Sequence, residues 1–147
     1  MLTGAFLLIL LGIAAIIPPL RRNRFYILNV ALVTGGAYFF ENKIFAIQNV
    51  LTYKTLLLFI IFHLFSINIT TFVAYGADKK AAIKKSWRVP EKDLHTLEFL
   101  GGWIGAFIGQ KFFRHKTAKK GYQTTYKLMI VSELLLIFGL LKYFGFL

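Results

Sequence analysis

The sequence predicts an all-α fold, that of a polytopic helical membrane protein. Of its 147 residues, 57% are hydrophobic and 17% aromatic, and the mean hydropathy is positive. A soluble domain of this length cannot bury so much apolar surface, whereas a bilayer accepts it. The formal charge of +12 arises from 18 basic and 6 acidic residues. The basic residues gather in short segments between apolar runs, as expected for loops that face anionic cytoplasmic lipids.

Residues 1–54 are expected to form a helical hairpin followed by an outer loop. The apolar run 2–17 has no basic segment before it and no small-residue cleavage site after it, so we interpret it as a retained membrane helix. It ends at Pro18 and Pro19, and the arginines of residues 21–24 place the turn in the cytoplasm. The second run, 25–40, leads into the weakly charged stretch 41–54, which should lie outside.

The third run, 55–75, has the length that a hydrocarbon core of roughly 30 Å requires. The run 97–108 is short for a crossing, and a crossing there would place the basic residues of 111–120 outside, against the usual charge bias. We therefore expect a glycine-rich re-entrant or packed helix at this point. With a last span at 128–147 this gives four spans in a single membrane domain, and five spans are the alternative.

A helix is expected to begin at Pro90, because proline suits the first helical position and acidic residues suit the first turn. On this helix Glu91, His95 and Glu98 share one face, and the glycines that follow extend that face. A doubled GxxxG pattern among these glycines predicts close packing against another helix in lipid. The helix-packing residues are Gly101, Gly102, Gly105 and Gly109.

Three interpretations of Glu91, His95 and Glu98 are open. The first is a metal or acid/base cluster, which would need help from Asp78, His63 or His115 to complete a ligand set. The second is that Glu91 and Asp93 stabilise the helix start and pair with neighbouring cations. The third is a binding site in which Glu91 orients a cation toward an anionic ligand. The absence of cysteine excludes disulfides and thiolate chemistry, and we assign no metal and no cofactor.

The segment 110–120, QKFFRHKTAKK, interleaves two phenylalanines with five basic residues. This composition suits a membrane surface, where aromatic rings enter the interface and cations meet lipid phosphates. Nonspecific lipid contact is one interpretation. A defined phosphate pocket is the other, formed by Lys79, Arg88, Arg114, His115 and Lys116. No nucleic-acid-binding module is recognisable, so we expect no nucleic-acid partner.

Two ionisable residues, His63 and Glu133, lie near the middle of predicted spans. Such residues are costly in lipid, so each should face a partner or a wet cavity. They could form one structural hydrogen-bonded pair, or they could belong to a proton or substrate relay.

Four motifs occur in order over the region 75–120: YGADKKAA from Tyr75, WRVPEKDLH from Trp87, GGWIGA from Gly101 and FRHKTAKK from Phe113. This arrangement resembles the small bacterial membrane proteins grouped as domain of unknown function 1294. The resemblance implies a polytopic protein of the bacterial inner membrane but supplies no activity. It places the family's signature at Asp78, Lys79, Arg88, Pro90, Glu91, Gly101, Gly102, His115 and Lys116, a set that leaves out Glu98. Within this signature we expect Asp78, Arg88, Glu91, His115 and Lys116 to form the site.

The leading hypothesis is a cytoplasmic-face pocket that binds the phosphorylated headgroup of a lipid, or a similar anionic amphiphile. An enzyme that transfers or hydrolyses such a headgroup is the second, with Asp78, Glu91 or His115 as the general acid or base. The third is a noncatalytic scaffold in which the glycine pattern builds a homo-oligomer. We expect anionic membrane lipids as partners.

Overall fold

In a computed structural model, residues 2–43, 53–143 and 145 are described, and every regular element among them is a helix. The prediction of an all-α fold is thus confirmed for this part of the chain. The centre of the expected outer loop, 44–52, lies outside the described residues. In chain order the elements are α1 (Leu2–Ile16), α2 (Pro18–Arg22), α3 (Arg24–Lys43), α4 (Tyr53–Lys84), α5 (Glu91–Leu97), the π-helical turn η1 (Glu98–Gly102), α6 (Trp103–Phe112) and α7 (Lys120–Tyr143).

Two of these helices, α4 and α7, are long and apolar enough to cross a membrane, and α1 is a shorter apolar helix. Both long helices extend beyond the apolar runs that predicted them. Helix α4 continues from the expected end at Tyr75 to Lys84, and α7 begins at Lys120 rather than at Leu128. The extension of α4 is rich in alanine and lysine, which are strong helix formers, and contains no proline. These polar extensions carry much of the site described below.

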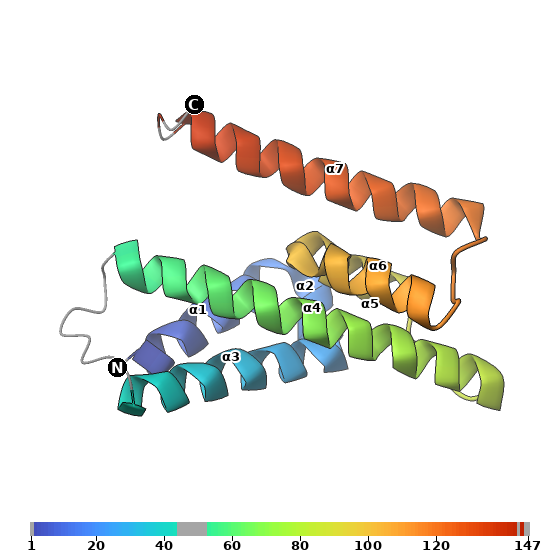
Figure 1. The fold of residues 1–147 in the computed structure, drawn as a ribbon, viewed down its shortest axis with the longest axis horizontal. Coiled ribbons are helices and arrows are strands. Elements are labelled where there is room, and N and C mark those ends of the chain that lie inside the picture. Colours follow the sequence, from blue (N-terminus) through green and yellow to red (C-terminus); the bar gives the residue numbers. More distant parts are fainter. Residues whose placement is uncertain (1, 44–52, 144, 146–147) are drawn as a thin grey trace.

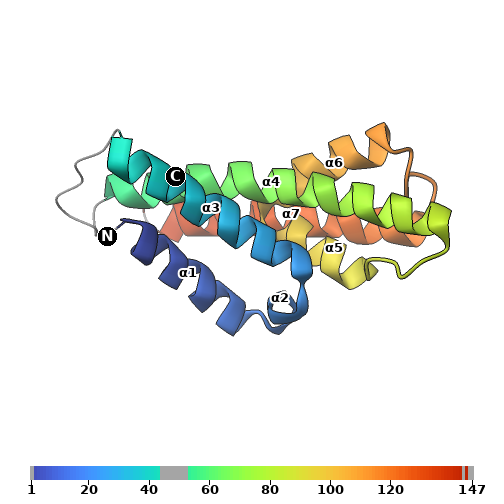
Figure 2. The ribbon, with the colours of Figure 1, turned by 90° about the horizontal axis from the view of Figure 1, so that it is seen from below.

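The helices form two groups along α4. Helices α1 and α3 pack as a hairpin against its first half, while α5, η1 and α6 lie along its second half, and α7 runs back beside them (Figures 1 and 2). Each group has its own buried cluster. Phe6, Leu10, Val33 and Phe59 belong to the first, and Ile67, Tyr75, Leu94 and Tyr122 belong to the second.

The helix expected to run from Pro90 to Gly109 is broken at Gly101. Pro90 precedes α5 as its cap, and at Gly101 the backbone adopts φ +99°, a left-handed conformation that glycine adopts without strain. The side chain of Asn68 on α4 bridges the break. It donates to the carbonyl of Gly101 (2.9 Å) and accepts from the amide of Gly105 (2.7 Å). Asn68 therefore satisfies backbone groups that the kink leaves without helical partners.

The glycines beyond the break face α4 of the same chain. A Cβ atom at Gly105 would overlap the backbone carbonyl of Asn68, one at Gly102 would overlap the Thr71 hydroxyl, and one at Gly109 would lie 3.0 Å from Cβ of Tyr75. Small residues allow two helix backbones to approach this closely. The expected close packing against another helix is thus made with the chain's own α4, which covers the face that the scaffold hypothesis would use to join two copies.

We predict that Gly105→Ala lowers the free energy of unfolding by about 1–3 kcal/mol, because the neighbour is backbone and cannot rotate away. The matched control is Gly139→Ala on α7, where an added Cβ meets nothing within 4 Å, and alanine should be neutral or slightly stabilising there. Thermal unfolding in detergent, followed by circular dichroism, compares the two. Equal stability of both variants would contradict the close α4–α6 approach.

Candidate functional site

Asp78 is the centre of the site. It lies on the C-terminal extension of α4, its side chain is 0% exposed, and cations from two later segments converge on it. The Arg88 guanidinium donates from Nε to Oδ1 (3.3 Å) and from a terminal nitrogen to Oδ2 (3.2 Å). The Nε2 atom of His115 lies 2.8 Å from Oδ2, and the Nζ atom of Lys116 lies 3.2 Å from it. One carboxylate thus organises the segments on both sides of α5 and α6.

Glu91 forms a second, more exposed arm of the same cluster. Its Oε1 atom accepts from Lys119 (2.7 Å) and from Lys116 (3.3 Å), so Lys116 bridges the two carboxylates. The ammonium group of Lys119 lowers the pKa of Glu91, with Lys116 contributing, which keeps Glu91 ionised at neutral pH. We call Asp78, Arg88, Glu91, His115, Lys116 and Lys119 the cation cluster.

The turn after α6 is held in a strained conformation. Arg114 and Lys116 have φ of +46° and +60°, in the left-handed region that side chains disfavour. Such a conformation costs on the order of 1 kcal/mol or more per residue and persists where surrounding contacts fix it. Here the amide of His115 donates to the carbonyl of Gln110 (3.0 Å), and the side chains of His115 and Lys116 contact Asp78. This backbone conformation directs the side chains of His115 and Lys116 toward the buried carboxylate of Asp78.

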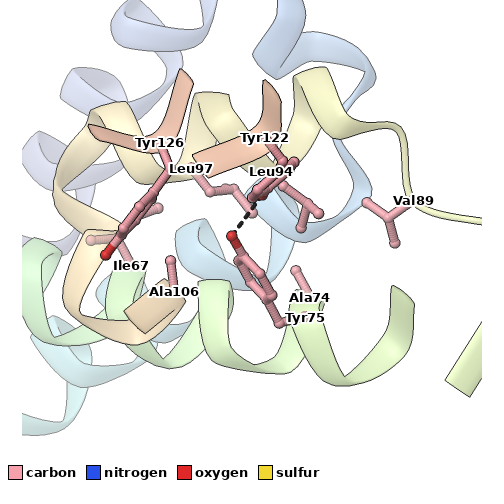
Figure 3. Close-up of a cluster of buried hydrophobic side chains, with 9 residues drawn as sticks. All are labelled: Ile67, Ala74, Tyr75, Val89, Leu94, Leu97, Ala106, Tyr122 and Tyr126. Atoms are coloured by element: carbon pink, nitrogen blue, oxygen red, sulfur yellow. Dashed lines mark hydrogen bonds between the residues drawn. The ribbon is translucent and has the colours of Figure 1, made fainter. Parts of the chain in front are cut away.

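A second polar group, Glu98, is buried where α4, η1 and α7 meet. Its side chain is 0% exposed, and its Oε1 atom accepts from the hydroxyls of Tyr75 (2.5 Å) and Tyr122 (2.8 Å). Figure 3 shows the Tyr75 hydroxyl of α4 pointing across the apolar cluster toward Tyr122 of α7, with the two oxygens 2.6 Å apart. The other carboxylate oxygen lies 2.6 Å from Nδ1 of His95, whose ring stacks on Tyr122.

The two polar groups are connected to each other. The ammonium group of Lys116 lies 4.5 Å from the centre of the Tyr122 ring, a favourable cation–π distance. The amide of Gln110 donates to the Tyr75 hydroxyl (3.0 Å), and Gln123 bonds both the Gln110 side chain (2.5 Å) and the carbonyl of Lys116 (3.0 Å). A continuous polar network therefore runs from Asp78 to His95.

The structure brings together Asp78, Arg88, Glu91, His115 and Lys116, the residues that the signature region indicated. Lys79 and Arg114 stand apart, since neither side chain makes a hydrogen bond or ion pair with the part of the chain that the structure describes. Of the three residues expected to share a helix face, His95 and Glu98 contact each other (2.6 Å), whereas the Glu91 carboxylate bonds lysines after α6. Among the described residues, no three histidine or acidic side chains converge as a metal site requires.

His63 and Glu133 do not form the hydrogen-bonded pair that was one expectation for them. The His63 ring lies 3.1 Å from the carbonyl of Leu100 and 3.4 Å from the Asn29 amide, and it stacks on Phe59. Oε2 of Glu133 is buried without a hydrogen-bond partner among the described residues, while Oε1 lies beside Gly101. The carbonyl of Leu100 is available to His63 because the helix breaks at the next residue.

Sequence reasoning missed Tyr75, Gln110, Tyr122, Gln123 and the bridging role of Asn68. Ending the third span at Tyr75 hid the fact that Tyr75 and Asp78 are one helical turn apart on the same face of α4. The tyrosines look like interfacial residues in sequence, and only the distances of their hydroxyls from Glu98 reveal a polar function. Lys119 was recognised as basic, but nothing in the sequence pairs it with Glu91.

The fold and site define a class of protein: a helical chain with two helices of membrane-spanning length and a polar network buried near their ends. The chain belongs to the family described as "Protein of unknown function (DUF1294)", which matches residues 68–122. It is 33% identical over 75 residues to the uncharacterized protein YsdA of Bacillus subtilis (strain 168), a match that covers 51% of this chain and 84% of that protein. No solved structure matches the chain.

We predict that Asp78→Asn lowers the free energy of unfolding by about 3–5 kcal/mol, because a buried carboxylate that balances several cations is lost. Glu91→Gln removes the other carboxylate, whose side chain is 41% exposed, and should cost only about 0–1 kcal/mol. Thermal unfolding in detergent distinguishes them. If Asp78→Asn were as stable as Glu91→Gln, the buried carboxylate would not organise the cluster.

Proposed function

We propose that this chain is a multi-pass protein of the bacterial inner membrane whose cation cluster binds the phosphorylated headgroup of a lipid or a similar anionic amphiphile. The observation that carries the proposal is the ion pair between the buried carboxylate of Asp78 and Arg88, a cation that remains exposed. The Arg88 side chain is 52% exposed while one edge of its guanidinium rests on Asp78. Its remaining donors are oriented in advance for a phosphate oxygen.

The charge of the cluster supports an anionic ligand. Its permanent cations are Arg88, Lys116 and Lys119, against the carboxylates of Asp78 and Glu91. The cluster therefore keeps an excess positive charge even when His115 is neutral. Lys119 is 59% exposed and, like Arg88, can reach a ligand without leaving its carboxylate. A phosphodiester carries one negative charge and would neutralise the excess.

The position of the cluster along α4 fits the headgroup level of a bilayer. At about 1.5 Å per residue, Asp78 lies roughly 35 Å along the helix axis from Thr55, which exceeds the roughly 30 Å of a hydrocarbon core. If α4 enters the core near Thr55, its last turns emerge into the interfacial region. The cluster then lies where lipid phosphates lie.

We propose that α1, α3, α4 and α7 are the four spans and that α5 and α6 are packed helices. The 10 residues of α6 reach about 15 Å, half of a hydrocarbon core. Helix α1 begins and α7 ends at the same end of the bundle, where α3 ends and α4 begins (Figure 2). The arginine-bearing corner at α2 contacts the start of α5 through a hydrogen bond from Asn23 to the carbonyl of Asp93. This contact supports a common side for both basic segments.

At Asp78 the same geometry favours binding over acid/base catalysis. Both oxygens of Asp78 already accept from cationic side chains, and the carboxylate has no exposed surface on which to meet a substrate. A general base must reach the proton that it removes. The glycine face on which the scaffold hypothesis relied is not free, because α4 covers Gly102, Gly105 and Gly109.

We predict that Arg88→Ala and Lys119→Ala each reduce the amount of phosphatidylglycerol retained by the purified protein about tenfold, since each removes one charge-assisted phosphate contact. His115 and Lys116 remain on Asp78 in both variants, so the fold should persist. Native mass spectrometry of protein extracted from phosphatidylglycerol-containing nanodiscs measures the retained lipid.

The control is Lys142→Ala, which removes one charge at the far end of α7, outside the cluster. It should retain phosphatidylglycerol as the unmodified protein does. Unchanged retention in both cluster variants, or equal loss in the control, would exclude the cluster as a specific headgroup site.

A further inference from the structure

A pocket separate from the cation cluster opens between the corner at α2 and the start of α5. Its volume is about 360 Å³, and its lining residues are Pro19, Arg22, Arg24, Trp87, Pro90, Lys92 and Asp93. We propose that this corner pocket is a second anion site, which binds a phosphate group. The volume is in the range of small-molecule sites, which leaves room for a phosphate and a small substituent such as glycerol.

The two segments that line the pocket are held together by buried groups behind its lining. Asn23 is 1% exposed, and its side chain donates to the carbonyl of Asp93 (3.1 Å) and accepts from the amide of Phe25 (3.1 Å). Leu20 is buried beside it, within the apolar cluster of the first helices. These contacts hold the segment that carries Arg22 and Arg24 against the segment that carries Lys92, and they form without a ligand.

The charges that line the pocket lack internal partners. Arg22, Arg24 and Lys92 face one carboxylate, that of Asp93, and none of them makes an ion pair with a described residue. Arg24 lies with its guanidinium 5.3 Å from the centre of the Trp87 ring, which orients the cation but does not neutralise it. The net excess of positive charge, with arginine donors available, is the chemistry that recognises phosphate.

Several neighbouring cations differ from those of the pocket in having internal partners. Arg88, Lys116 and Lys119 each rest on Asp78 or Glu91. Arg21 is next to Arg22 in sequence, yet its guanidinium donates to the carbonyls of Ala14 (3.3 Å) and Ala15 (2.8 Å) and does not line the pocket. Adjacent arginines of equal charge thus have different surroundings, which provides a matched pair for a test.

The test uses the fluorescence of Trp87. The chain has two tryptophans, so Trp103→Phe makes Trp87 the sole one. This substitution keeps the hydrogen bond from Tyr126, which goes to the backbone carbonyl of Trp103. Protein in a phosphate-free maltoside detergent is titrated with inorganic phosphate in one arm and with short-chain phosphatidylglycerol in the other. We expect a saturable change in at least one arm. Saturation by phosphate identifies a soluble ligand, and saturation by the lipid alone identifies a headgroup.

In the arm that saturates, Arg22→Gln and Lys92→Gln should each weaken the apparent affinity about tenfold, the effect of one charge-assisted contact. Arg21→Gln should change it by less than about twofold. No saturation in either arm overturns the proposal, and so does an Arg21→Gln effect as large as that of Arg22→Gln, which would mean that only diffuse charge is sensed. Arg88→Ala removes a member of the cation cluster but no residue that lines the corner pocket. The apparent affinity measured through Trp87 should therefore be unchanged in this variant, which separates the corner pocket from the cation cluster.

Discussion

The close approach of α6 to α4 is the constraint on which the rest of the structure depends. Glycines at three levels of the contact allow the two backbones to touch, and Asn68 satisfies the backbone groups exposed by the break at Gly101. This contact places Gln110 beside Tyr75 and directs the turn after α6 toward Asp78. A larger separation would move His115 and Lys116 away from the Asp78 carboxylate. Beyond about 3.5 Å they would no longer form hydrogen bonds with it.

The buried polar network follows from this packing and determines which side chains meet at the site. Burying Asp78 and Glu98 is unfavourable unless their oxygens are bonded, and here each carboxylate accepts from several side chains. Each acceptor comes from a different segment than its donors, so the network joins α4, α5, η1, the turn after α6 and α7. In such a network the loss of one member leaves others unpaired. The buried Asp78 carboxylate thereby fixes the positions of Arg88, His115 and Lys116, of which Arg88 is exposed.

Much of this could be predicted from the sequence, and the limits have physical reasons. Apolar runs identify helices because burial in lipid dominates, and clustered basic residues indicate the site because they interrupt those runs. The end of α4 could not be placed, since the apolar run ends at Tyr75 while helix propensity continues through alanine and lysine. The start of α7 could not be placed either, because the apolar run begins only at Leu128 and the residues before it, from Lys120, are largely polar. The break at Gly101 was hidden inside a glycine pattern that suits an unbroken helix equally well. Glu98 and the tyrosines are joined only by tertiary packing, which no spacing in the sequence encodes.

The family segment and the rest of the chain contribute differently. Residues 68–122 contain the carboxylates and cations of the cation cluster and the glycines that face α4. The corner pocket is shared: Trp87, Lys92 and Asp93 belong to that segment, whereas Arg22 and Arg24 precede it. A buried asparagine at position 23 bonds across the boundary to Asp93. The N-terminal helices therefore do more than pack against one another and against α4, since they supply two of the four charged residues that line the corner pocket.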